Sequence, residues 1–398
     1  MPSPASFPFP AEHALRPSPQ LAAIREGGAP VRVQLKYGDP AWLVTRYEDA
    51  RFVLSDPAFS RDCERVGIPG DRVARATPVD PTTQTLLAVD PPDHTRLRRF
   101  VYRTFTPRRV EGLRPGTRRI ADGIVDDMIA QGPPADLFRG LGLSLPLQVI
   151  CDLLGVPLAD RDRFGVWSED LLIGTASVEQ AMDGLDKMNA YLGDLAAQRR
   201  REPTDDLIGA LVNARIEGDH LTDGEVENLL RILHGAGHET SAAHIPNFVF
   251  VLLVSGEYTR LVAEPELIPA AVEELLRYLP LLTQGSLTRF VLTDVEVGGV
   301  PLRAGDQVFV ELSAADRDAD VFDDPETLDL AREKNPHIAF GYGMHRCLGA
   351  ALARMELQVA LETLTERLPG LRLAEPADSV SWLVDRFVRR PEELPVAW

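Results

Sequence analysis

The chain has 398 residues, 44% of them hydrophobic and 26% charged, which is the composition of a globular protein and excludes a collagen, a coiled coil or a disordered chain. With 42 basic and 60 acidic residues its formal net charge is −18, which argues against a general binder of nucleic acid or of anionic membranes. The longest uninterrupted apolar run, Phe248 to Val254, is far shorter than a membrane span.

The N-terminal region is rich in proline and reads MPSPASFPFP, without the basic and apolar stretches of a secretory signal. We expect residues 1–30 to lie as an extended segment on the surface. The chain has three cysteines, Cys63, Cys151 and Cys347, and an odd number fits a reducing compartment better than a disulfide framework. We therefore expect a cytoplasmic protein with no membrane anchor.

Two separate regions have the alternating pattern of β-strands. Residues 31–47 alternate around a turn at 37–40, which predicts a hairpin. Late in the chain, residues 291–297 and 308–312 are strand-like, and a Gly298-Gly299 turn follows the first of them. These short elements predict a small sheet region.

Helical patterns fill most of the remaining chain. The longest begins with a capping box at Thr222 and Glu225 and continues at helical spacing to about Val254, with a kink expected at Pro246. Further helices are indicated after residues 90–93, over 270–279 and from about 348 onward. With no internal repeat and no linker, the pattern predicts one large, mostly α domain over residues 1–398, with the sheet to one side.

The most informative segment is residues 340–349, which read Phe-Gly-Tyr-Gly-Met-His-Arg-Cys-Leu-Gly. Two glycines two residues apart allow a loop to turn tightly and to approach a flat partner closely. Cys347 follows directly before an amphipathic helix, whose N-terminal partial charge favours thiolate over thiol. A thiolate in such a loop indicates a nucleophile or a metal ligand, whereas Cys63 and Cys151 are expected to be buried structural cysteines.

This segment meets every fixed position of the pattern F-G-x-G-x-H-x-C-x-G and resembles the haem-binding loop of the cytochrome P450 family. The resemblance implies the cytochrome P450 fold and haem b (iron protoporphyrin IX) as cofactor, with Cys347 as the axial thiolate ligand of the iron. It also implies that the other fixed residues of the loop contact the cofactor, namely Phe340, Gly341, His345 and Gly349.

Further motifs extend the resemblance over nearly the whole chain. His94 and Arg98 are four residues apart and share one helical face, which by itself indicates a solvated surface. In the family these two positions bind the haem propionates, which need cationic or N–H partners. Arg289 and His345 match two more propionate-binding positions, so the resemblance implies four such residues.

The segment Ala236-Gly237-His238-Glu239-Thr240 resembles the oxygen-binding groove of the family. The small residues Ala236 and Gly237 would leave room beside the cofactor for dioxygen, and the acid–alcohol pair of Glu239 and Thr240 would deliver protons. Without the cysteine loop, the same pair would be interpreted as ordinary helix surface. Two other histidines nearby, His234 and His244, are expected to line the pocket or to pack in the core.

Glu274 and Arg277 match the E-x-x-R pair of the family and share a helical face, so they would form a buried ion pair that stabilises the fold. The family usually supplies a third arginine from a segment in which this chain has Thr327 instead. Either Arg332 or Arg317 takes its place, or the pair lacks a third member.

The resemblance implies a monooxygenase that inserts one oxygen atom from O2 into an organic substrate. The chain has no nicotinamide or flavin fingerprint, so electrons are expected from a ferredoxin and its reductase. Between His94 and Arg119, nine arginines accompany a single acid, Glu111, and this segment is either a solvated face or a docking patch for an acidic ferredoxin. Two other functions remain open: a peroxygenase of the same fold, which is expected to lack the acid–alcohol pair, and a haem protein used for binding or sensing.

By family position, the substrate pocket is expected to be lined by residues 61–89, His234 and its neighbours, 281–285 and 386–388. These stretches mix Arg, Thr, Gln and His with Leu and Phe. They indicate a large, partly polar substrate, and we expect a polyketide or peptide natural product that is hydroxylated or epoxidised.

Overall fold

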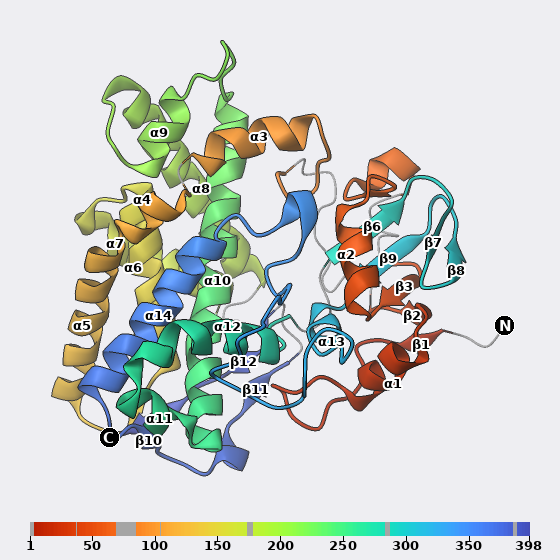
Figure 1. Cartoon of the computed structure of the whole chain (residues 1–398). Coiled ribbons are helices and arrows are strands. Elements are labelled where there is room, and N and C mark those ends of the chain that lie inside the picture. Colours follow the sequence, from red (N-terminus) through yellow and green to blue (C-terminus); the bar gives the residue numbers. More distant parts are fainter. Residues whose placement is uncertain are drawn as a thin grey trace.

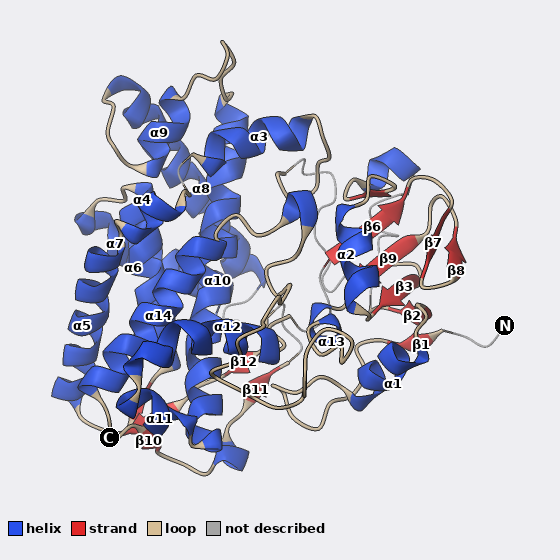
Figure 2. Cartoon of the chain, in the orientation of Figure 1, coloured by secondary structure: helices blue, strands red, loops and turns tan. Residues whose placement is uncertain are grey.

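The computed structural model describes residues 4–36, 38–68, 85–103, 105–172, 178–282, 287–384 and 388–398. Helices fill one side of the molecule and most strands lie on the other, with the 33-residue helix α10 (Asp223–Ser255) running through the helical side (Figure 1, Figure 2). This arrangement confirms a mostly helical fold with a small sheet region to one side.

The helices are α1 (Pro19–Gly27), α2 (Tyr47–Ser55), α3 (Asp93–Tyr102), α4 (Pro107–Glu111), α5 (Arg114–Gln131), α6 (Ser144–Leu154), α7 (Arg161–Leu172), α8 (Val178–Arg201), α9 (Leu207–Asn213), α10, α11 (Glu257–Ala263), α12 (Ile268–Tyr278), α13 (Leu312–Ala315) and α14 (Ala350–Arg367). The strands are β1 (Ala5–Ser6), β2 (Val31–Gln34), β3 (Ala41–Val44), β4 (Phe59–Ser60), β5 (Ala135–Asp136), β6 (Leu287–Val291), β7 (Val295–Val297), β8 (Val300–Leu302), β9 (Gln307–Val310), β10 (Arg372–Leu373), β11 (Trp382–Leu383), β12 (Arg390–Pro391) and β13 (Pro395–Ala397).

The largest sheet has the strand order β1-β2-β3-β9-β6-β4. Its β2 and β3 pair antiparallel, which confirms the predicted hairpin, although Tyr37 in the turn lies outside the described residues. The strand β6 pairs antiparallel with both β9 and β4, and Ser60 at the end of β4 lies opposite Phe290. The chain that leaves β4 therefore runs beside Arg289, a residue of the candidate site.

The region predicted as one strand over 291–297 is divided in the structure, which corrects the sequence analysis. Val291 ends β6, and β7 begins at Val295. Between them, the Asp294 carboxylate accepts hydrogen bonds from the Arg303 side chain and from the Ala304 backbone N–H, so this segment turns away from the sheet. The predicted glycine turn is confirmed: Gly298 and Gly299 have φ angles of 53° and 77° and join β7 to β8.

The N-terminal segment is not extended over all of residues 1–30, as the sequence analysis expected. Pro19 begins the helix α1, and the Ser18 side chain caps it by accepting a hydrogen bond from the Gln20 N–H. Phe7, Leu15 and Leu21 are buried against the sheet and the helical core. Burial of these apolar side chains stabilises the segment against the body of the protein.

The long helix α10 begins as predicted, with both hydrogen bonds of the capping box between Thr222 and Glu225, and it continues through Pro246. It packs on the segment 138–143 and on α6, α8 and α14. All of its residues from Ser241 to Phe250 are buried, and Ile245, Phe248, Val249 and Phe250 belong to the main apolar core. Among the described residues, no single helix is long and apolar enough to cross a membrane. The helices α10 and α11 taken together are long and apolar enough, but the chain bends by 98° between them.

Candidate active site

The cysteine loop connects the sheet side of the molecule to α14. A hydrogen bond from the Cys347 N–H to the Phe340 carbonyl, 2.8 Å long, closes it. Gly341 and Gly343 both have a φ of 72°, a conformation that favours glycine. A Cβ atom on Gly343 would lie 2.5 Å from the carbonyl oxygen of Leu54 in α2, so the close approach that this glycine permits is to a protein backbone.

Cys347 is a free, exposed thiol two residues before the N-cap of α14, Gly349. Desolvation by the surrounding protein atoms raises the pKa of the Cys347 thiol, whereas the Gly349 N–H and the Arg98 guanidinium lower it. The predicted effect of the helix terminus is thus present, and desolvation opposes it.

A side-chain network that the sequence analysis did not identify attaches the start of the loop to two helices. Glu273 of α12 accepts hydrogen bonds from His337, at 2.9 Å, and from Arg354 of α14, at 2.6 and 2.7 Å. Although burial disfavours its charge, these donors lower the pKa of Glu273 to about 2. The Arg354 guanidinium also lies 4.5 Å from the centre of the Phe340 ring. Glu273 precedes the E-x-x-R motif by one residue and has no motif of its own, so only the fold reveals its role.

The four residues expected to bind propionates come together from α3, β6 and the cysteine loop. His94 and His345 have ring centres 4.2 Å apart, and the Arg98 guanidinium donates to the Arg346 carbonyl at 2.6 Å. Arg289 is 2% exposed, and its Nη1 donates to the Thr288 carbonyl at 3.1 Å. These four basic side chains thus share one region of the protein beside Cys347.

The two histidines of this group have buried nitrogens without a protein partner. The Nε2 atoms of His94 and His345 are both buried, and neither has a hydrogen-bond partner among the described residues. Burial, together with the nearby Arg289, lowers the pKa of His345 to about 2, and burial and Arg98 lower the pKa of His94 to about 4. Unpaired buried nitrogens beside buried cations are the donor set that an anion with carboxylate groups satisfies. The residues therefore fit a haem, whose two propionates are such groups.

The expected oxygen-binding groove lies on α10. Ala236 is exposed and Gly237 is half-buried, whereas the following turns are buried, so the small residues border open space. The Thr240 hydroxyl donates to the Ala236 carbonyl at 2.8 Å and keeps its lone pairs free to accept. Burial raises the pKa of Glu239 to about 7, against the opposing effect of Arg390. The acid is thus able to hold or release a proton near neutral pH.

The other histidines of α10 are packed rather than exposed to the groove. His234 shares a 2.9 Å hydrogen bond with the Ser168 hydroxyl of α7, and its ring meets Phe164 edge-on. His238 contacts the Leu143 carbonyl at 3.1 Å. His244 is buried, with its ring 5.0 Å from that of Phe248. Of the two roles left open for His234 and His244, the structure supports packing.

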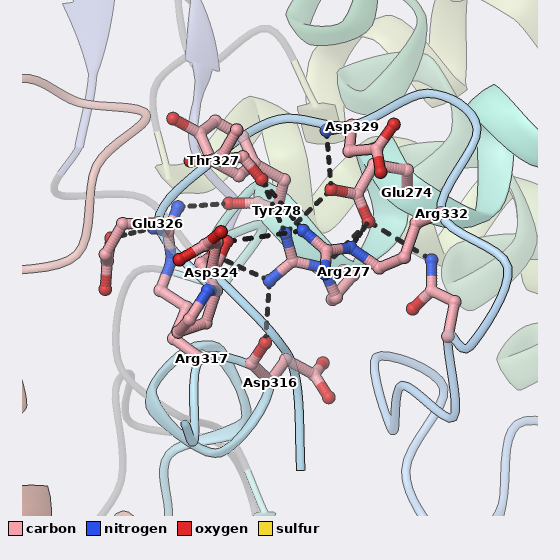
Figure 3. Close-up of polar contacts among 12 residues, drawn as sticks. Glu274, Arg277, Tyr278, Asp316, Arg317, Asp324, Glu326, Thr327, Asp329 and Arg332 are labelled. Carbon is pink, nitrogen blue, oxygen red and sulfur yellow. Dashed lines mark hydrogen bonds and ion pairs between the residues drawn. The ribbon is translucent and has the colours of Figure 1, made fainter. Parts of the chain in front are cut away.

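The E-x-x-R pair and its missing arginine are resolved by the structure (Figure 3). Arg277 donates to both carboxylate oxygens of Glu274 at 2.8 Å, and both side chains are fully buried. Arg332 adds a third interaction, from its Nε to Glu274 Oε2 at 3.0 Å. Arg317 instead pairs with Glu326 and donates to the Tyr278 carbonyl at 2.7 Å. Arg332 is therefore the residue that replaces the arginine absent at Thr327.

The arginine-rich segment 94–119 is less positive than the sequence analysis assumed. Arg96 pairs with Asp219 and Glu225, and Arg99 pairs with Glu217. Three more of its arginines pair with acids from elsewhere or from their own helix, namely Arg109, Arg114 and Arg118. Because most of these acids lie outside residues 94–119, counting charges within the segment overestimates its local field.

A smaller exposed surface remains beside the cysteine loop, and we call it the Tyr102–Met344 patch. Its apolar members are Tyr102, 58% exposed, and Met344, 38% exposed. They border a hollow at the surface that is also lined by His94, Thr95, Arg98, Arg99, Arg103, Gly343 and Arg346. Exposed apolar side chains rimmed by cations are typical of a transient protein–protein contact.

Comparison with known proteins agrees with this geometry. The family model described as cytochrome P450 matches residues 259–368. The chain is 47% identical over 395 residues to nocardicin C N-oxygenase of Nocardia uniformis subsp. tsuyamanensis, covering 99% of this chain and 98% of the relative. It is 45% identical over 398 residues to mycinamicin IV hydroxylase/epoxidase of Micromonospora griseorubida, covering 99% of each.

Solved structures show the same similarity. The crystal structure of the LnmA cytochrome P450 hydroxylase, from the leinamycin biosynthetic pathway of Streptomyces atroolivaceus S-140, matches with a TM-score of 0.92 and 45% identity over 99% of this chain and 100% of that chain. The mixed-function P450 MycG matches with a TM-score of 0.95 and 44% identity over 100% of both. The chain therefore belongs to the cytochrome P450 family and is a monooxygenase whose cofactor is haem.

Proposed function

We propose that Cys347 is the iron ligand of this monooxygenase and that Glu239 and Thr240 deliver the protons of its reaction. The observation that carries the proposal is the position of a free, exposed Cys347 beside a basic group whose buried histidine nitrogens have no protein partner. When bound, the haem supplies the iron at which dioxygen is reduced. His94, Arg98, Arg289 and His345 would hold its propionates, and Phe340, Gly341 and Gly349 would border it on the cysteine side.

The overall reaction takes up one dioxygen, two electrons and two protons, and it yields the oxygenated substrate and one water. The protons must be delivered to the dioxygen. Glu239 is able to supply them because its pKa of about 7 keeps a fraction of its carboxyl protonated at neutral pH. Thr240 lies next to it, with its hydroxyl held by the Ala236 carbonyl and its lone pairs available to accept a proton donor. Ala236 and Gly237 leave the space for dioxygen.

The ligand assignment is tested by the absorption of the reduced protein with carbon monoxide. A thiolate ligand gives the strongly red-shifted Soret band of this family, and we expect Cys347→Ser to lose it. Cys151→Ser is the matched control, because Cys151 is buried in the core on α6. A red-shifted band that survives Cys347→Ser, or that disappears in a folded Cys151→Ser protein, contradicts the assignment.

For the substrate, we propose a natural product of polyketide or peptide type that is hydroxylated or epoxidised. The names of three relatives support this class, since they refer to nocardicin C, to mycinamicin IV and to the leinamycin pathway. Within the chain, two of the expected pocket segments meet: Leu282 bridges to Val388, and the Arg389 N–H donates to the Leu281 carbonyl at 2.7 Å. Much of the expected lining, at 69–84, 283–285 and 386–387, lies outside the described residues.

The substrate class is tested by titrating the ferric protein with two panels, macrocyclic polyketides and modified peptides, and recording the shift of the Soret band. Saturable shifts confined to members of one panel, followed by turnover of the same compounds, are the expected result. Binding of small terpenes or fatty acids with equal affinity and with equal turnover would overturn the proposal.

We further propose that a ferredoxin, reduced by its reductase in the cytoplasm, donates electrons at the Tyr102–Met344 patch. The patch adjoins the cysteine loop, and its rim holds the exposed Arg103, which favours an acidic partner. Arg103→Glu should slow electron transfer at low salt, with the effect fading as salt screens the charge. Arg372→Glu is the matched control, because Arg372 is exposed in β10 at the other end of the helical side (Figure 1). Equal rates for the two variants would exclude this surface.

A further inference from the structure

The strand β4 brings another arginine to the propionate-binding residues. In the antiparallel pairing of β4 with β6, Phe59 lies opposite Val291 and Ser60 opposite Phe290, so Arg61 follows in the position across from Arg289. The side chains meet as well. Arg61 Nη1 donates to the Thr288 carbonyl at 3.0 Å, and Arg289 Nη1 donates to the same oxygen at 3.1 Å. The two guanidinium nitrogens are therefore at most about 6 Å apart.

Arg61 is held in this position by the main chain. Its Nε donates to the Leu87 carbonyl at 2.8 Å, and its own backbone N–H donates to Asp90 at 3.1 Å. These contacts orient the guanidinium without neutralising it, because carbonyl groups carry no net charge. Two cations at such a separation repel one another wherever water is excluded.

The nearest acid does not balance the two cations. Asp90 accepts hydrogen bonds from the Ser60 hydroxyl, the Arg61 backbone and the exposed Arg65 side chain, and its single charge acts on both Arg61 and Arg289, so one acid faces two buried cations. The charge of Arg61 also acts on the neighbouring site. The pKa of His345 is lowered first by burial, then by Arg289 and third by Arg61. The pKa of Arg289 is lowered first by burial and then by Arg61.

We infer that Arg61 is a fifth propionate-binding residue, which forms with Arg289 a guanidinium pair for one propionate of the haem. A carboxylate accepts two such donors in charge-assisted hydrogen bonds, which are about twice as strong as neutral ones. Its negative charge also removes the repulsion between the two arginines. The geometry explains why a second arginine is tolerated at the end of β4, where it has no carboxylate partner of its own among the described residues. The inference rests on haem as the cofactor and not on the identity of the iron ligand or the substrate.

The test uses the haem-loaded enzyme and the variants Arg61→Gln and Arg61→Lys. Haem release is measured by transfer to an excess of a haem-free globin. A lost charge-assisted bond corresponds to a release roughly 10- to 100-fold faster for Arg61→Gln. Arg61→Lys, which keeps the charge but not the planar donor pair, should give an intermediate rate. Arg65→Gln is the matched control with an unchanged rate, since Arg65 shares Asp90 but is 47% exposed.

Two spectroscopic readouts separate a haem contact from a structural role. In Arg61→Gln, the propionate bending bands in the resonance Raman spectrum should shift, and the reduction potential of the iron should fall because a nearby positive charge is lost. The red-shifted band of the reduced carbon monoxide complex should persist, so this outcome is independent of the Cys347 assignment. Unchanged haem release together with unchanged propionate bands in Arg61→Gln would overturn the inference. An effect confined to substrate affinity would likewise overturn it and place Arg61 in the substrate pocket.

Discussion

Two groups of buried charges in this protein both contain arginines, and they differ in how those arginines are paired. Around Glu274, two arginines share one carboxylate, and backbone carbonyls take up their remaining donors (Figure 3). Around His345, several basic groups gather and only one acid among the described residues, Asp90, acts on them. The first group is complete within the protein, and the second becomes complete only with a ligand.

The difference shows how a cofactor site is recognised when no cofactor is present. A buried arginine costs free energy unless it is paired, so an unpaired group is retained only where something else pairs with it. A third arrangement, a buried carboxyl group without a cation, completes the comparison. Glu356 of α14 is 2% exposed, and Ser241 of α10 donates a hydrogen bond to it. It avoids the cost of burial by remaining protonated, since burial raises its pKa to about 8.

The largest expected effect comes from removing the carboxylate of the group around Glu274. Glu274→Gln leaves Arg277 and Arg332 buried without a carboxylate, and we expect it to reduce the free energy of unfolding by about 3–5 kcal/mol. The matched control is Asp183→Asn, whose side chain is 60% exposed and pairs with Lys187, itself 55% exposed, for which we expect about 1 kcal/mol or less. Urea unfolding followed by far-UV circular dichroism measures both. Equal losses would show that burial does not separate the two pairs.

The next largest effect is expected from the buried acid Glu356, and this effect on stability depends on pH. Between pH 4.5 and 8 the unfolded chain loses the proton of Glu356 while the folded protein keeps it, so the stability of the wild type falls as pH rises. Glu356→Gln lacks this dependence. We therefore expect the variant to gain about 2–4 kcal/mol relative to the wild type between pH 5 and pH 8, at about 1.4 kcal/mol per pH unit. Parallel stability curves over this range would contradict a neutral Glu356.

Removing a cation from the incomplete group should affect the cofactor more than the fold. Arg289→Gln should release haem roughly 10- to 100-fold faster, which corresponds to about 1.5–3 kcal/mol, while the unfolding midpoint in the presence of excess haem changes little. Arg303→Gln is the control, since Arg303 is 69% exposed in its pair with Asp294. A variant that unfolds more easily at saturating haem, with unchanged haem release, would make Arg289 part of a complete structural group.

The smallest effect concerns proton delivery by Glu239, a second buried acid with a raised pKa. Its carboxyl group donates only when protonated, so product formed per electron consumed should fall as pH rises through about 7, by about tenfold between pH 6 and pH 8. Glu239→Gln should be poorly coupled at every pH. Thr240→Ala should divert electrons to peroxide or water, whereas Thr240→Ser, which keeps the hydroxyl, should not. Unchanged coupling in Glu239→Gln and Thr240→Ala would show that neither residue delivers protons and that both are ordinary helix surface.

Motifs built from neighbouring residues were predicted well. The capping box that begins α10, the hairpin of β2 and β3 and the turn at Gly298 and Gly299 all occur as expected. The grouping of His94, Arg98, Arg289 and His345 was also expected, but only through the family resemblance. Three segments spread over about 250 residues of the chain supply these side chains, and no local pattern links them.

Other features could not be predicted because they depend on contacts between distant parts of the chain. The choice of Arg332 over Arg317 depends on where residues 316–332 pass α12, and Arg61 reaches Thr288 across 227 residues. Partners up to 248 residues away likewise neutralise much of the arginine-rich segment.

Local geometry and residue chemistry could thus be predicted from the amino-acid sequence. They include helix starts, tight turns, a cysteine in a glycine loop and an acid beside an alcohol. These follow from backbone conformation and from spacing within a few residues. The ionisation of Cys347, Glu239 and Glu356 and the charge balance of the two arginine groups were settled only by folding. Desolvation and Coulomb energy depend on every group within several ångströms, and the fold alone determines which groups those are.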